Sequence, residues 1–329
     1  MSQPQKGICA EPNLHAQYLL FNVIDDDYGA IRSKLAKCLE LFDTYEDEHY
    51  EAMVTGVVAI GNGFWDDIYP NAKPDGLAPF PDMQCDDRFA PVMPADVFVQ
   101  IRTDRLDICH EIGIKVVELL QFHTEMVEQV RAFRYLDGRD LTGFIVTDDN
   151  PMGQKKFDVA VVGDDLPCSG GSYIHIQRYR HDILRWKELS ESQQEEIMGR
   201  TREHNLPVLD SGLSSHAFRT KVTGPDGEYP ILLNQSMPYG NMSVQGLYFV
   251  SCSANPNALS RYLFSRIYGD QQGHYDKLLD YSVAETGAAF FAPSINFIKQ
   301  AALLNETTDE MEQEFDASSF ILDASKSTD

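Results

Sequence analysis

The chain has 329 residues, enough for two domains or one large domain with a substantial core. Hydrophobic residues make up 43% and charged residues 24%, so the composition excludes a disordered, collagen-like or low-complexity chain. The 51 acidic residues outnumber the 27 basic ones, and the net charge of −24 opposes binding to nucleic acid or to an anionic membrane.

The six cysteines form no CxxC pair and follow no regular spacing; they are Cys9, Cys38, Cys85, Cys109, Cys168 and Cys252. The first ten residues lack the basic and apolar regions of a signal peptide. No apolar run approaches the ~18 residues that are needed to span a bilayer. We therefore expect reduced thiols in a cytoplasmic protein.

The first 133 residues alternate between strand and helix patterns. Strands are predicted over His15–Val23, 53–60 and 97–102, and helical spacing predicts helices over 28–41 and 104–129. The order strand, helix, strand, strand, helix indicates a ferredoxin-like α+β lobe over residues 1–133.

A second α+β lobe is expected over residues 159–305. Its predicted strands are 160–162, 172–179, 216–221, 231–233 and 247–251, and its predicted helices are 191–203 and 257–267. Residues 134–158 between the lobes are rich in Gly, Asp, Asn and Pro, which favours a linker or functional loop. Residues 306–329 form an acidic, Ser-rich tail that we expect to be mobile.

Common cofactor motifs are incomplete. Gly61-Asn62-Gly63 lacks the third glycine of a dinucleotide fingerprint, and His110-Glu111 lacks the second histidine of a zinc helix. No phosphate-binding loop is present. Sites for NAD, zinc and ATP are therefore poorly supported.

An ordered set of short motifs is more informative. FRYLDGRDLTGFI (residues 133–145), followed by Asp149-Asn150-Pro151, resembles the characteristic loop of the dye-decolourising, or DyP-type, haem peroxidases. Further blocks that resemble this family follow in order: Gly170-Gly171-Ser172-Tyr173, Gln177-Arg178, Trp186, Gly199-Arg200-Thr201, Ser215-His216 with Arg219, Ser236-Met237-Pro238-Tyr239-Gly240, Gly246-Leu247-Tyr248-Phe249 and Phe291-Ala292-Pro293-Ser294. Each block alone is weak, but the ordered set, which covers roughly half the chain, is specific.

The resemblance implies two ferredoxin-like lobes in the DyP-type dimeric α+β barrel fold, with haem b held mainly by the second lobe. It implies that His216 binds the haem iron, while the other ring nitrogen donates to a carboxylate, for which Asp276 is the candidate. Arg219 and Arg200 are candidates to bind the haem propionates, and surface salt bridges are their alternative role. The implied activity is oxidation of small electron donors by hydrogen peroxide, and the family resemblance implies a homo-oligomer.

The sequence departs from the family on the other haem face. The family has an aspartate in the pattern GFxDGxxNP and an arginine shortly before the Pro-Tyr-Gly block. Ungapped counting places Val146 at the aspartate, Thr147 at the following glycine and Asn234 at the arginine. Peroxide cleavage needs a group that moves a proton and a positive donor that stabilises the separating charge, and valine does neither.

Four residues are candidates to compensate. Asp148 and Asp149 lie close to the lost aspartate, although acids in an Asp-Asp-Asn-Pro turn are commonly just solvated. His175 belongs to a predicted strand, and it either lines the pocket or is hydrogen-bonded to a neighbouring residue. Asn234 keeps a neutral donor and acceptor that can bind a polar ligand above the iron.

Three functions remain open from the sequence. The first is a haem peroxidase with an altered distal pocket. The second is a haem-binding protein without peroxidase chemistry, such as a carrier, a sensor of a small ligand or a catalyst of another haem reaction, which Val146 and Asn234 favour. The third is a haem-free relative, against which the retention of His216 argues.

Overall fold

The computed structural model describes residues 2–146, 149–163, 168–225 and 227–303. The predicted tail, residues 306–329, and two residues of the predicted distal segment, Thr147 and Asp148, lie outside the described residues. No helix in the described part of the chain is long and apolar enough to cross a membrane.

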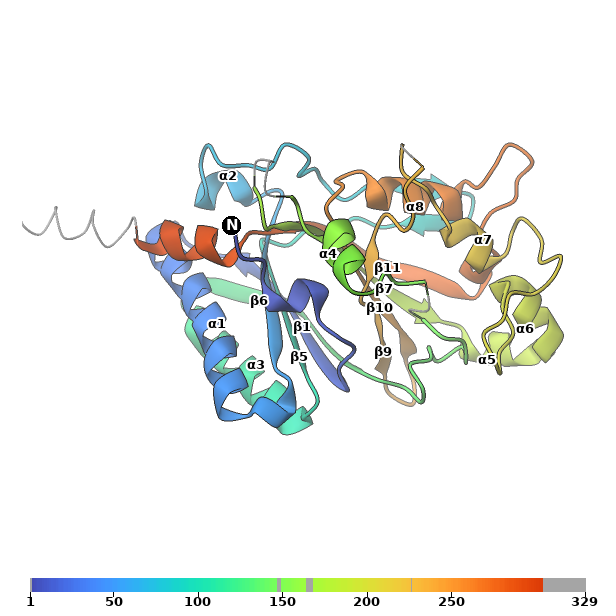
Figure 1. Cartoon of the computed structure of the whole chain (residues 1–329), viewed down its shortest axis with the longest axis horizontal. Helices are drawn as coiled ribbons and strands as arrows, with labels where there is room; N and C mark the ends of the chain where they lie inside the picture. The colour runs from blue at the N-terminus through green and yellow to red at the C-terminus, as the bar shows by residue number, and fades with distance from the viewer. Residues whose placement is uncertain (1, 147–148, 164–167, 226, 304–329) are drawn as a thin grey trace, which may run out of the picture.

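The first lobe contains four antiparallel strands and two long helices. In chain order these are β1 (His15–Val23), α1 (Tyr28–Glu48), β2 (Thr55–Gly61), β5 (Val97–Thr103), α3 (Leu106–Leu120) and β6 (Thr124–Phe133). The strand order β2-β5-β1-β6 is that of a ferredoxin-like sheet. Figure 1 shows α1 and α3 along one face of these strands.

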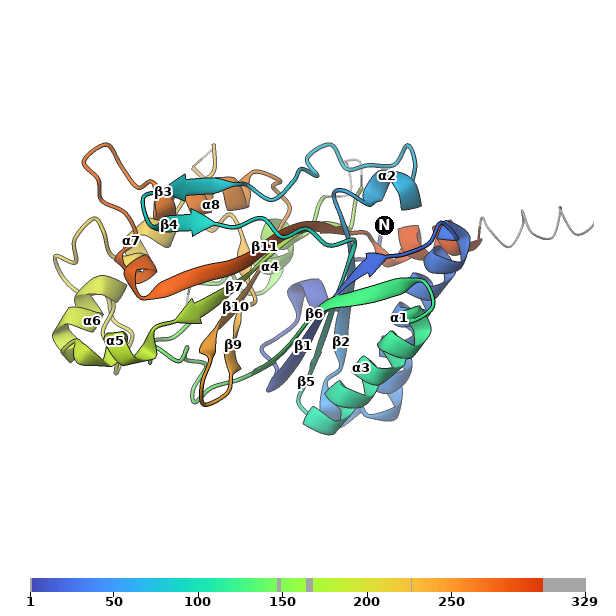
Figure 2. The same ribbon diagram turned by 180° about the vertical axis from the view of Figure 1, so that it is seen from behind.

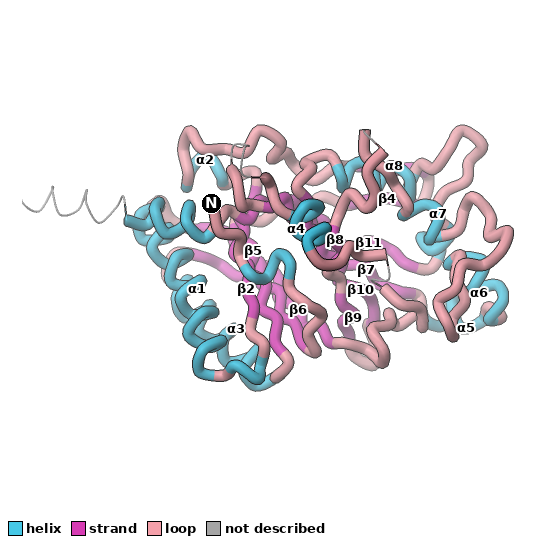
Figure 3. The backbone as a smooth tube through the Cα atoms, viewed as in Figure 1, coloured by secondary structure: helices cyan, strands magenta, loops and turns pink. Residues whose placement is uncertain are grey.

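The second lobe repeats this arrangement. Its strands are β7 (Ser172–His181), β8 (Leu233–Asn234), β9 (Met237–Gly240), β10 (Gln245–Ser253) and β11 (Ser282–Ala292), in the order β11-β7-β10-β9, with β8 paired to β10. Its helices are α5 (Ile183–Glu188), α6 (Glu191–Met198), α7 (His216–Thr220) and α8 (Ala258–Ile267). Much of the layer opposite these strands is loop (Figure 3).

Short elements complete the described chain. They are the helices α2 (Trp65–Ile68) and α4 (Gln154–Ala160), the 3-10 turns Lys6–Cys9, Tyr50–Ala52 and Lys277–Asp280, and the hairpin of β3 (Met83–Cys85) and β4 (Arg88–Ala90). This hairpin lies beside α8 in the view from behind (Figure 2).

The two lobes join into one closed sheet. Strand β2 pairs with β11, β6 pairs with β9, and β7 pairs with both β10 and β11, so that the strands form a ring. Successive side chains of β1 face opposite sides: Leu19 packs toward α1 and α3, whereas Tyr18 points into the barrel and stacks on Tyr248 at 4.3 Å between ring centroids. The predicted α+β fold with two ferredoxin-like lobes is confirmed.

Three sequence predictions of local structure were wrong. Residues 124–133 form strand β6 and not the end of a helix, because alternate residues such as Val130 and Ala132 are buried inside the barrel. Residues 216–220 form helix α7 and not a strand. The segment 160–162 contains the end of α4 and no strand, because Ala160 completes that helix and packs against the barrel core.

Candidate active site

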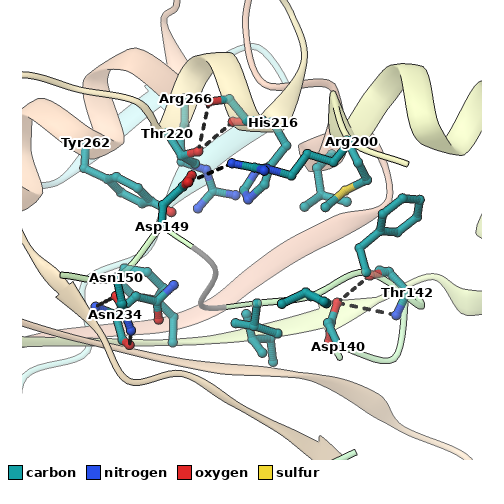
Figure 4. A pocket seen from close by; sticks show the side chains of 18 of the residues that line it. Asp140, Thr142, Asp149, Asn150, Arg200, His216, Thr220, Asn234, Tyr262 and Arg266 are labelled. Atoms are coloured by element: carbon teal, nitrogen blue, oxygen red, sulfur yellow. Dashed lines mark hydrogen bonds and ion pairs between the residues drawn. The ribbon is translucent and has the colours of Figure 1, made fainter. Parts of the chain in front are cut away.

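A pocket in the second lobe lies between the barrel strands and the helices α7 and α8. One wall carries residues of β7, β8 and β10 and the loop that precedes α4, and the other carries residues of α7 and α8. In Figure 4, His216 and Arg266 lie on one side of this pocket, and Asn150 and Asn234 lie on the other. Apolar side chains such as Leu247, Phe249 and Leu278 contribute to the lining.

His216 is the first residue of α7 and is oriented by a buried carboxylate. Its Nδ1 lies 2.8 Å from Oδ2 of Asp276, which is fully buried. Arg266 Nε donates to the same oxygen at 2.7 Å, and the Leu278 N–H donates to the other oxygen at 3.1 Å. Nε2 of His216 has no hydrogen-bond partner within the described part of the chain. Since Nδ1 donates to the carboxylate, the lone pair of the imidazole is on Nε2.

The charge balance around Asp276 keeps it ionised. Burial by itself would raise the pKa of Asp276, but its interactions with His216 and Arg266 outweigh burial, so that this pKa lies well below its ordinary value. Arg266 also donates to the Tyr179 hydroxyl at 3.0 Å. The geometry thus contains the His216–Asp276 contact that the resemblance implied.

The pocket is also lined by Val146 and Asn234, the residues that ungapped counting placed at the family's aspartate and arginine. Val146 donates its backbone N–H to the Gly138 carbonyl at 3.3 Å. Asn150 holds the backbone of Asn234 through two hydrogen bonds, of 2.6 and 2.9 Å. The side-chain oxygen of Asn234 accepts from the N–H and the hydroxyl of Ser236, whereas its side-chain NH2 has no partner among the described residues. This part of the lining therefore offers a neutral donor and an apolar group.

Asp149 and Arg200 both line the pocket and bind each other. Arg200 Nη2 lies 2.7 Å from Asp149 Oδ1, and Arg200 Nη1 donates to the Asn205 carbonyl at 3.2 Å. Burial, together with Asp149, raises the pKa of Tyr229 in the same wall to about 12. Asp149 is therefore close enough to act on a ligand, but its carboxylate already has a cationic partner.

Two other candidates lie away from the pocket. Arg219 does not line it, because its guanidinium is buried against Asp270, with 2.7 Å between Nη2 and Oδ2. We therefore correct the expectation that Arg219 points to the propionates. His175 is buried on β7 beside Phe80 and does not line the pocket; burial lowers its pKa to about 4. Asp148, another candidate for the distal side, lies outside the described residues.

A buried pair that sequence reasoning missed also lines the pocket. His181 Nε2 lies 3.0 Å from Oδ2 of Asp140, its Nδ1 lies 2.9 Å from the Ser282 hydroxyl, and the Thr142 hydroxyl donates to Asp140 at 2.8 Å. Burial would raise the pKa of Asp140, but His181 outweighs it and the pKa is lowered. Asp140 falls within the motif at residues 133–145, so its place in that block was the available signal, but only the fold brings His181 to it.

Comparison with known proteins identifies the family that this fold and this site define. The family model described as Dyp-type peroxidase, N-terminal, matches residues 5–134, and the model described as Dyp-type peroxidase, C-terminal, matches residues 137–297. The chain belongs to the Dyp-type peroxidase family.

Individual relatives cover nearly the whole chain. A dye-decolorizing peroxidase of Mycobacterium tuberculosis is 32% identical over 86% of this chain and 86% of its own length. The crystal structure of a putative dyp-type peroxidase from Shewanella oneidensis matches with a TM-score of 0.89 and 40% identity, over 91% of this chain and 99% of that one. A variant of DypB from Rhodococcus jostii, solved in complex with heme, matches with a TM-score of 0.85 and 30% identity, over 90% and 97%.

Proposed function

We propose that this chain is a haem-dependent peroxidase-type oxidoreductase with an altered distal pocket, which binds haem b through His216 and uses hydrogen peroxide to oxidise small electron donors. The observation that carries the proposal is the buried Asp276, which orients His216 and leaves Nε2 unbonded at the pocket. An oriented neutral imidazole beside apolar walls is the donor set that haem iron requires.

On the proximal side, His216 provides the ligand and Asp276 holds its tautomer. Because Arg266 shares the same carboxylate oxygen, it draws negative charge away from the His216 contact and limits how strongly Asp276 raises the basicity of the imidazole. Arg200 is the cation that we assign to a propionate, and its contact with Asp149 positions the guanidinium at the pocket. Bound haem supplies the redox centre that reacts with peroxide.

On the distal side, the chain must move a proton without an aspartate at position 146. Val146 cannot accept one, and Asn234 supplies a neutral donor in place of a fixed positive charge. The groups that remain are Asp149, Asp148 and the buried couple of His181 and Asp140. His181 contacts the Asp140 carboxylate and the Ser282 hydroxyl at the pocket, so this couple is a further candidate to relay a proton.

Rapid mixing of the haem-loaded protein with peroxide tests the proposal. A slow change of the Soret absorption on adding peroxide, coupled to oxidation of a dye, supports it. Asp140→Asn and Asp149→Asn, measured in parallel, show which carboxylate takes part, and Asp182→Asn, a helix cap outside the pocket, is the matched control. A haem complex that never turns over peroxide contradicts the proposal.

A second candidate function is haem binding without peroxidase chemistry, as a carrier, a sensor of a small ligand or a catalyst of another haem reaction. The unpartnered side-chain NH2 of Asn234, beside the apolar Val146, favours it, because a neutral donor stabilises a polar iron ligand without cleaving it. Carbon monoxide binding that weakens when Asn234 is replaced by Leu, with no peroxide turnover in the parent, would select this function.

The cellular location and the oligomeric state of the protein are also proposals. All six cysteines are free thiols, which supports a cytoplasmic location. We also propose a homo-oligomer, by analogy with the family to which the chain belongs.

A further inference from the structure

A second cavity, of about 460 Å³, adjoins the first pocket. Val146, Asn150 and Asn234 line both spaces and so form the wall between them. The second cavity lies at one end of the barrel, where β5 and β6 meet the segment that contains the predicted loop. It reaches the surface, since Met152 in its lining is 84% exposed.

Arg102 is a buried cation in this cavity. On β5 it follows the alternation of Phe98 and Gln100, so that it points toward the barrel interior and is only 4% exposed. In the described part of the chain, its guanidinium makes one hydrogen bond, from Nη1 to the Gln235 side-chain oxygen at 3.1 Å, and it has no carboxylate partner. Its Nε is buried without a partner.

A buried charge without a counterion is unusual. Burial lowers the pKa of Arg102, which is the sign of an incompletely compensated cation. Such groups are normally paired, because removing a charge from water costs several kcal/mol if nothing replaces the lost hydration. In a chain with a net charge of −24, acidic partners were abundant, yet no described acidic side chain pairs with Arg102.

The rest of the cavity is also positive. Arg134 lies two residues beyond Ala132, an inward-facing residue of β6, and its described contacts include no ion pair. The two acidic lining residues already face cations: Glu11 lies 2.7 Å from Lys156, and Asp137 lies 3.9 Å from Arg139. Two positive charges, those of Arg102 and Arg134, are therefore left for a ligand.

We propose that this cavity is a binding site for a small organic carboxylate. A guanidinium pairs with a carboxylate through charge-assisted hydrogen bonds, and among the described contacts of Arg102 only Nη1 has a hydrogen-bond partner. Apolar lining residues, among them Pro12, Leu233 and Met237, supply a surface for the organic part. The volume is within the range of small-molecule sites. This site requires no haem, so it stands apart from the proposed function.

Isothermal titration calorimetry with benzoate tests the site on the full-length protein. Saturable binding of benzoate is expected, with binding of the neutral isostere benzamide weaker by at least about tenfold, because the charge-assisted pair is lost. Arg102→Gln is expected to weaken benzoate binding by at least about tenfold as well. Arg105→Gln is the matched control, since Arg105 follows the same strand and is paired with Glu51 and Asp107 outside the cavity.

Two further measurements keep the proposal open to refutation. Arg134→Gln, at an exposed position, is expected to weaken benzoate binding by a smaller factor, and it decides the matter if Arg102→Gln does not fold. Benzoate should also raise the Tm of the parent protein in proportion to its occupancy. Equal binding of benzoate and benzamide, binding of phosphate but not benzoate, or unchanged affinity in both arginine variants would overturn the assignment.

Discussion

Replacing Asp276 by Asn removes one charge from a fully buried network while keeping the side-chain shape. His216 and Arg266 both contact Oδ2, at 2.8 and 2.7 Å, so the variant leaves the Arg266 charge without its carboxylate. Breaking a buried ion pair by removing one partner typically costs about 3–5 kcal/mol. In the variant, the Arg266 guanidinium still lies over the rings of Tyr179 and Tyr262, with Cζ 5.2 and 5.4 Å from the ring centroids, and these rings partly stabilise the cation. We therefore expect Asp276→Asn to lower the free energy of unfolding by about 3 kcal/mol, near the lower end of that range.

Urea denaturation of the parent and of three variants measures this loss. The variants are Asp276→Asn, Arg266→Met and the double change, and the double variant should be more stable than the sum of the single losses predicts by at least about 1 kcal/mol. Asp270→Asn is the matched control, because Asp270 also binds an arginine but is 28% exposed, so a smaller loss is expected. A loss below about 1 kcal/mol for Asp276→Asn, or strictly additive single losses, would refute the assignment of Asp276 as the centre of a buried charge network.

Three other predictions follow from the same geometry. Folding lowers the pKa of Asp276, so the stability that this carboxylate contributes is complete above its unfolded pKa near ~3.9 and is lost as the pH falls below that value. Acid should therefore destabilise the parent more than Asp276→Asn, which urea denaturation curves between pH 6 and 2 will show. Parallel pH profiles of the two proteins would contradict this prediction. The haem-loaded parent should react with peroxide slowly. The double variant Val146→Asp with Asn234→Arg, with or without Thr147→Gly, should react faster by a factor of at least ~10² in stopped-flow absorbance. If the parent reacts fast and Asp148→Asn reacts slowly, the catalytic acid lies two residues further along the chain. Light scattering should show a dimer or a larger assembly, and a single species of 37.1 kDa at every concentration would refute the oligomer.

The order of strands and helices in the first lobe was largely readable from periodicity, but the sequence prediction omitted β9 and β11 of the second lobe and extended the helix of α3 into β6. The pattern of 104–129 continues the helical spacing of α3 across the turn into β6, and only barrel closure shows that Val130 and Ala132 belong to a strand. The motif Ser215-His216 was read as a strand because five residues are too few to display helical periodicity.

In the candidate site, too, some contacts were predicted from the sequence and others were not. His216 and Asp276 lie 60 residues apart and were paired through family register, whereas His181 and Asp140, 41 residues apart, were missed, since nothing local connects β7 with the loop. Arg219 illustrates the opposite error: it is near His216 in sequence, but Asp270 binds its guanidinium away from the pocket. Contacts between distant segments depend on which competing partner lies closest in the fold, and local sequence does not contain that information.

A haem titration of His216→Ala, followed by the Soret absorption, tests most directly whether His216 binds the haem iron. The parent is expected to bind haem with a histidine-ligated ferric spectrum. His216→Ala is expected to lose or greatly weaken haem binding, and added imidazole is expected to restore part of it. His204→Ala, at an exposed histidine outside the pocket, should bind like the parent. Unchanged haem content and an unchanged ferric spectrum in His216→Ala would contradict the assignment of His216 as the iron ligand.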